Sequence, residues 1–114
     1  MSIKINTLDN LIAIYGIPKF CKIDVEGYEE EVLKGLSVKV PYISFEYTIP
    51  ERLESIINCF SLLSRIGEFD CNFTKGEEMK FVFVDWVSKE KILIHLQGMH
   101  EDGLFGDIYI RFKV

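Results

Sequence analysis

Short apolar runs of strand length alternate with segments of helical periodicity along this 114-residue chain, and this alternation limits the folds that it can adopt. The expected elements, in chain order, are a helix at 7–15, a strand at 20–25, a helix at 28–33, a strand at 42–48, a helix at 51–66, strands at 69–74 and 79–86, a helix at 88–98 and a strand at 107–114. Strands separated by helices of this length are typical of βαβ units, whose strands run parallel. The sequence therefore predicts an α/β fold with a mostly parallel sheet.

Composition limits the class of partner that the chain can bind. The net charge is -5 at pH 7, and the 13 Lys and Arg residues are scattered along the chain. Because phosphate binding depends on clustered basic side chains, nucleic acid and acidic membrane surfaces are poor partners. No apolar run approaches the roughly 20 residues that span a bilayer. The first residues also lack the apolar core of a signal peptide.

The three cysteines, Cys21, Cys59 and Cys71, indicate the compartment. Their number is odd, their spacing is wide, and each lies in an apolar or strand-like run. Such cysteines are typical of buried, reduced thiols rather than of a disulfide framework. Reduced thiols are the rule in reducing compartments. We therefore expect a cytoplasmic protein.

The segment 22–27, which reads Lys-Ile-Asp-Val-Glu-Gly, joins an expected strand to an expected helix. Asp24 falls at the carboxyl end of the strand and Glu26 in the turn, where Gly27 lets the backbone turn without a Cβ clash. Ligands of open parallel sheets bind outside the carboxyl ends of the strands. The two carboxylates are thus candidates for accepting hydrogen bonds from a substrate hydroxyl or a cationic donor, or for binding a metal. Acidic residues beside a helix start are equally typical of simple helix caps.

Several short motifs occur in the order seen in one known family. They are Thr7-Leu8-Asp9, the segment 22–27, Glu29, Val32-Leu33-Lys34-Gly35 and a strand ending in Phe45-Glu46, with Trp86, Ser88 and Gly106-Asp107-Ile108-Tyr109 further along. This ordered set resembles the FkbM family of methyltransferases. The resemblance implies the carboxyl-terminal half of a Rossmann-like class I methyltransferase sheet, mostly parallel with an antiparallel last strand. It also implies methyl transfer from S-adenosylmethionine to a hydroxyl group on a sugar, another glycan or a natural product.

The same resemblance implies roles for particular residues. Asp24 and Glu26 are expected at the rim of the sheet near the methyl donor and the acceptor, and Asp24 is also expected to face the cofactor. Glu46, at the end of the next strand, is a third candidate catalytic residue. The resemblance implies no metal ion.

The chain departs from the family in one respect. A full-length member places its glycine-rich cofactor loop upstream of the Thr-Leu-Asp segment, which here begins at residue 7. Gly16, Gly27, Gly35 and Gly67 are typical of helix ends and turns and do not replace that loop. Residues 1–114 are therefore expected to form a single partial domain without the cofactor-binding half. The function is then a methyltransferase fragment that is inactive alone or, alternatively, a non-catalytic dimerisation or interaction module derived from that fold.

The strand that holds Asp24 is expected at an edge of the sheet. Right-handed crossovers place the helices at 7–15, 28–34 and 51–66 on one face, and the helix at 88–98 is expected to cover part of the other. A bare edge exposes unpaired backbone groups and invites pairing with another chain. We therefore expect a homodimer, formed through the open face or the strand of Asp24, or a partner chain that supplies the missing half.

Overall fold

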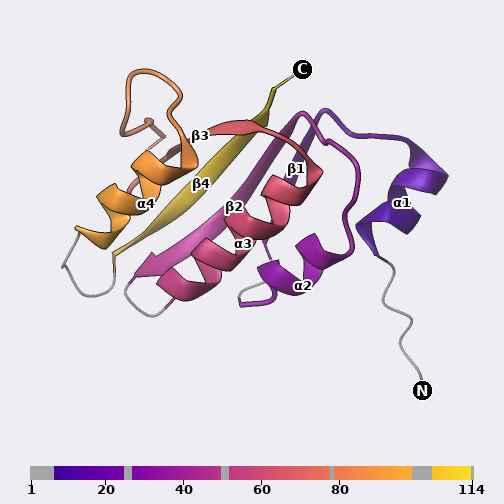
Figure 1. Cartoon of the computed structure of the whole chain (residues 1–114), viewed down its shortest axis with the longest axis horizontal. Coiled ribbons are helices and arrows are strands. Elements are labelled where there is room, and N and C mark those ends of the chain that lie inside the picture. The colour runs from indigo at the N-terminus through magenta and orange to yellow at the C-terminus, as the bar shows by residue number, and fades with distance from the viewer. Residues whose placement is uncertain (1–6, 25–26, 50–51, 78, 99–103, 114) are drawn as a thin grey trace.

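Helices and strands alternate along the chain in the order that the sequence predicts, with one strand fewer (Figure 1). A computed structural model describes residues 7–24, 27–49, 52–77, 79–98 and 104–113. The elements are α1 (Leu8–Tyr15), β1 (Phe20–Ile23), α2 (Glu29–Lys34), β2 (Tyr42–Ile49), α3 (Leu53–Ile66), β3 (Phe69–Phe73), α4 (Lys89–Gln97) and β4 (Leu104–Phe112). None of these helices is long and apolar enough to cross a membrane.

Local capping residues set the ends of several helices. The hydroxyl of Thr7 accepts a hydrogen bond from the backbone N–H of Asn10 at 3.1 Å and so begins α1. Ser88 caps α4 in the same way. α1 and α3 end at Gly16 and Gly67, where the chain turns back toward the sheet. The hydroxyl groups of Thr7 and Ser88 thus satisfy backbone N–H groups that have no partner within the helix.

The four strands form one mixed sheet in the order β1-β2-β4-β3. β1 and β2 are parallel, whereas β4 is antiparallel to both of its neighbours, β2 and β3. The last strand is therefore antiparallel, as predicted, and it lies between two strands that precede it in the chain. Its register places Ile108 opposite Phe45 of β2 and Phe73 of β3. The chain is thus a small α/β domain with a four-stranded mixed sheet.

The helices α2, α3 and α4 cover one face of this sheet, which we call the helix face (Figure 1). α2 and α3 lie there, as the crossover rule predicts. The expectation that the helix from Ser88 covers the other face is wrong, because α4 packs on the helix face, where His95 contacts the ring of Phe73 at 5.4 Å between centroids. α1 lies beyond the β1 side of the sheet, and none of its residues is buried.

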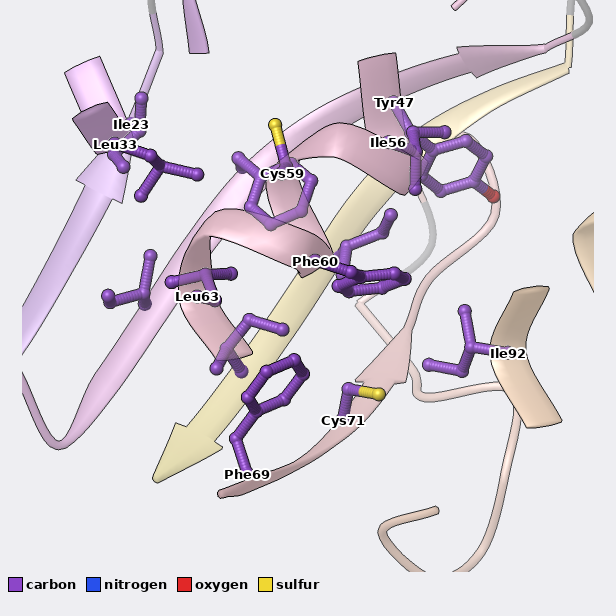
Figure 2. Close-up of a cluster of buried hydrophobic side chains, with 14 of the residues drawn as sticks. Ile23, Leu33, Tyr47, Ile56, Cys59, Phe60, Leu63, Phe69, Cys71 and Ile92 are labelled. Carbon is purple, nitrogen blue, oxygen red and sulfur yellow. The ribbon is translucent and has the colours of Figure 1, made fainter. Parts of the chain in front are cut away.

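The hydrophobic core lies between the sheet and α3 (Figure 2). Phe60 of α3 occupies its centre, with ring centroids 6.2 Å from Phe45 and 5.9 Å from Phe69. Leu63 and Ile56 lie on the same stripe of α3 and are at most 2% exposed. Aromatic pairs at these separations add to the free energy of burial. The stripe that the helical periodicity predicts on α3 is therefore the face that holds the layers together.

The predicted strand at 79–86 is wrong. Residues 79–87, which we call the cover segment, form no regular strand and pair with β3 through a single isolated bridge between Val87 and Cys71. Phe83 contacts Phe73 and His95 on the helix face, whereas Phe81 contacts Tyr109 on the opposite face. Side chains two apart in a regular strand point to the same face. This segment therefore cannot be a strand, although its apolar residues alternate.

The cover segment protects the outer edge of β3. The backbone groups of Cys71 and Val87 exchange two hydrogen bonds of 2.7 and 2.9 Å. The buried side chain of Asn72 donates to the carbonyl oxygen of Phe83 at 2.9 Å and accepts from its N–H at 3.2 Å. Covering an edge in this way prevents its pairing with other chains.

Gly106 of β4 provides a test of the close contact between β4 and the end of β3. A methyl group at this position would overlap the carbonyl oxygen of Thr74. We expect Gly106→Ala to lower the free energy of unfolding by about 1–3 kcal/mol, because the backbone must shift. Urea denaturation measures this change. Gly98→Ala is the control, because its nearest atoms would lie at an ordinary 3.5 Å, and equal losses in the two variants would contradict the contact.

The cysteines provide a second test. Burial, followed by nearby carboxylates, raises the pKa of both Cys59 and Cys71 to about 12, from 9.0. Both thiols should stay unreactive toward a disulfide reagent at pH 8 until the protein unfolds, whereas the half-buried Cys21 should react in the folded state.

Because these pKa values are raised, the unfolded chain loses the thiol protons first as the pH increases. The contribution of both thiols to stability should be complete below about pH 9 and decrease between pH 9 and 12. Urea denaturation at pH 8 and pH 10 measures the decrease. Simultaneous labelling of all three thiols in the folded protein would contradict their burial.

Candidate functional site

Two of the three predicted site residues lie together at the carboxyl end of β1, beside the middle of β2. The expectation that Glu46 ends its strand is wrong, because β2 continues to Ile49. Asp24 follows β1 directly, and Glu46 lies in β2. Because Ile23 is opposite Phe45 in the register, Asp24 is level with Glu46 on the face away from the helices, which we call the open face. Both residues line one pocket of about 320 Å³, the acidic pocket. Glu26 lies outside the described residues.

The rest of the acidic pocket comes from the later strands. Asp107 of β4 is directly opposite Glu46 in the antiparallel register, and Tyr109 lies two residues further along β4 on the same face. Thr74 and Glu77, which follow β3, close the other side. The sequence analysis did not identify these four residues as site residues. The alternation of the last strand was a signal for Asp107 and Tyr109, but the insertion of β4 next to β2 was needed to bring them to Glu46.

The charge of this pocket is negative. Its lining includes four carboxylates, of Asp24, Glu46, Glu77 and Asp107, and one ammonium group, of Lys22. Carboxylates accept hydrogen bonds from hydroxyl groups and attract cations, whereas they repel phosphate. Within the described part of the chain, no three His, Cys, Asp or Glu side chains are grouped so that they could hold a metal ion. The pocket is therefore suited to a hydroxyl-bearing or cationic ligand.

Thr74 holds one side of this pocket in place. Its N–H donates to the carbonyl oxygen of Asp107 at 2.9 Å, and its hydroxyl accepts from the N–H of Asp107 at 3.2 Å. The hydroxyl of the buried Tyr47 donates to the carbonyl oxygen of Thr74 at 2.8 Å. Burial, and then the charge of Asp107, raises the pKa of Tyr47, which keeps this donor protonated. The position of Asp107 is thus tied to the core.

The turn between β1 and α2 is held by its own contacts. Gly27 adopts a positive φ of 91°, and its N–H donates to the carboxylate of Glu29 at 2.9 Å. Glu29 is buried, although a helix start usually exposes its acidic residues. The guanidinium group of Arg52 lies against Gly27, and both line a hollow of about 220 Å³ together with Glu46. Glu46 therefore lies between this hollow and the acidic pocket.

Aromatic side chains cover the open face beside the acidic pocket. Phe81 of the cover segment lies 5.1 Å from Tyr109 and 5.4 Å from Trp86, between ring centroids. The guanidinium group of Arg111 lies over the Trp86 ring at 4.7 Å, and Tyr42 contacts the same ring. The cover segment therefore shields part of the open face and leaves the end with Asp24 and Glu46 accessible.

No family model and no curated protein sequence matches this chain. The class that the structure defines is a small α/β domain, with a four-stranded mixed sheet and an acidic pocket where β1 ends beside β2.

Gly27 tests the geometry of the turn that carries the site. Gly27→Ala should lower the free energy of unfolding by about 1–2 kcal/mol for the positive φ, plus the cost of displacing Arg52. Gly16→Ala is the matched comparison, because Gly16 has a φ of 90° and no atom within 4 Å of the added methyl group. Urea denaturation of a double-mutant cycle with Arg52→Ala measures the second part. Equal losses of unfolding free energy for Gly27→Ala and Gly16→Ala would contradict this arrangement. So would a Gly27→Ala loss that is no smaller when Arg52 is replaced by Ala.

Proposed function

We propose that these residues form the carboxyl-terminal half of an S-adenosylmethionine-dependent O-methyltransferase domain resembling the FkbM family, and that this half is inactive alone. One observation carries the proposal. The sequence motifs single out Asp24 and Glu46. Asp24 directly follows β1, Glu46 lies level with it in the parallel neighbour β2, and both line one pocket at the carboxyl end of β1. This is where open α/β sheets bind ligands. The antiparallel last strand also agrees with the half-domain that the resemblance implies.

The residues of the pocket suit the reacting end of such a site. S-adenosylmethionine would supply a methyl group on a positively charged sulfur, and the carboxylates of the acidic pocket favour positive charge. Asp24 and Glu46 can accept hydrogen bonds from an acceptor hydroxyl. When the acceptor hydroxyl is methylated, one of these carboxylates would take its proton. By the resemblance, Glu26 is a third carboxylate of this rim.

The adenosine end of the cofactor needs a different set of groups. A glycine-rich turn between a strand and a helix would bind it, and the described glycines lie instead at helix ends, in turns and in β4. Gly27, in the turn after β1, is occupied by Glu29 and Arg52. We propose that the cofactor half comes from residues outside 1–114, on the same polypeptide or on another. The three cysteines are free thiols, which fits our proposal of a cytoplasmic location.

Calorimetric titration with S-adenosylmethionine tests this function. The 114-residue chain alone should show no binding. A mixture with the glycine-rich half of an FkbM-type methyltransferase should show binding in the micromolar range and methylate a sugar hydroxyl. Asp24→Asn should reduce methylation at least about tenfold, whereas Glu54→Gln, on the exposed side of α3, should not. Tight binding by the chain alone, or no gain in the mixture, would disprove the proposal.

A second function is supported by a separate observation. β1 is an edge strand next to an apolar groove, which is the surface of a dimerisation or interaction module rather than of an enzyme. A stable dimer, with no binding of S-adenosylmethionine in either titration, would favour this function.

A further inference from the structure

The two edges of the sheet differ in their protection. The cover segment binds along β3, whereas within the described ranges β1 has only β2 as a strand neighbour. The N–H of Tyr42 donates to the carbonyl oxygen of Lys19 at 3.2 Å, so Lys19 faces β2. Because backbone groups of alternate residues point to opposite sides of a strand, those of Phe20, Lys22 and Asp24 point outward. Unpaired outward groups of this kind can form hydrogen bonds with another strand.

An apolar groove of about 600 Å³ runs along this edge. Leu8 of α1 lies on one side of it, Tyr28 and Val32 lie on the α2 side, and Cys21 and Ile23 of β1 line its base. A strand that paired with β1 would lie against this groove. The apolar walls would then lose contact with water, which favours association.

α1 adds to the apolar surface on this side of the molecule (Figure 1). Its sequence is largely apolar, yet none of its residues is buried, and Ile14 and Tyr15 are 67% and 81% exposed. Tyr28, at the groove, is 68% exposed. A helix that is apolar on most sides is normally buried against another element. Leu8 and Ile12 pack partly against the core, but the described chain leaves Ile14 and Tyr15 uncovered, and a partner could cover these two side chains.

The charges of β1 indicate which partner fits. Lys22 of β1 and Asp24, which directly follows β1, are exposed, have opposite charges and line the same pocket on the open face. When two copies of this edge pair antiparallel about Ile23, Lys22 lies opposite Asp24 of the partner subunit, and the two-fold axis repeats the pair. Pairing about Lys22 would place like charges opposite each other. The edge is therefore complementary to itself in one register.

We propose that a second copy of this chain docks on β1, in antiparallel pairing centred on Ile23, and joins the two sheets into one. The outward backbone groups of Lys22 and Asp24 form the hydrogen bonds, and their side chains form two ion pairs across the axis. The groove and α1 supply the apolar surface that this contact buries. The dimer requires no ligand, and it does not depend on the proposed methyltransferase function.

Sedimentation equilibrium of the full chain over a concentration series tests this dimer. The chain should show a reversible monomer–dimer equilibrium. Lys22→Asp and Asp24→Lys should each raise the dimer dissociation constant about tenfold, because each makes both cross-axis pairs repulsive. The double variant Lys22→Asp/Asp24→Lys restores opposite charges and should return to within about threefold of the original value. Lys80→Asp and Glu54→Lys make the same charge changes at exposed sites away from β1 and should leave it unchanged.

Hydrogen exchange keeps the proposal testable if a variant does not fold, as circular dichroism would show. In the original chain, the amide protons of Lys22 and Asp24 should exchange slowly above the dissociation constant and rapidly on dilution. A monomer at every concentration would overturn the proposal. So would a dimer that the single charge reversals leave intact, failure of the double variant to recover, or exchange at β1 that does not depend on concentration.

Discussion

The insertion of β4 between β2 and β3 is the interaction on which the rest of the structure depends. It pairs one strand with two earlier ones, so that Ile108 and Ile110 complete the helix face together with Phe45 and Phe73. α3 can then bury Phe60 against a continuous apolar surface. The same register brings Asp107 and Tyr109 to Glu46 on the open face, so the core and the acidic pocket have one origin.

The close approach of β4 to Thr74 connects these two faces. Gly106 leaves room for the carbonyl oxygen of Thr74, which also accepts the hydrogen bond of the buried Tyr47. A side chain at residue 106 would separate the end of β3 from β4 and displace Asp107. Contacts with the core, rather than a flexible loop, thus fix the positions of Asp107 and Thr74 in the acidic pocket, which favours a preorganised site.

The two edges of the sheet differ in a way that bears on both proposed functions. At β3 the cover segment satisfies the backbone, whereas at β1 the backbone groups and the apolar groove are available for a partner. A cofactor half and a second copy of the chain would use the same edge. A dimer would therefore protect β1 until another strand competes for it. Asp24 lines both the acidic pocket and the apolar groove at this edge.

The sequence alone determined the elements with strong local signals. The helical stripe of α3 and the caps at Thr7 and Ser88 depend on nearby residues or on a clear periodicity. The motif at 22–27 likewise predicted the turn after β1, where Gly27 has a positive φ.

Only the tertiary structure decided the fate of the cover segment and the full set of pocket residues. The aromatic residues at 81 and 83 have a strand-like spacing. However, Phe83 packs on Phe73 and Phe81 packs on Tyr109, on opposite faces of the sheet, and this packing outweighs the local preference for a strand. The side of the sheet that α4 covers also depends on contacts with β3 and not on its own sequence. Asp107 and Glu46 are far apart in the chain, and strand order alone brings them together.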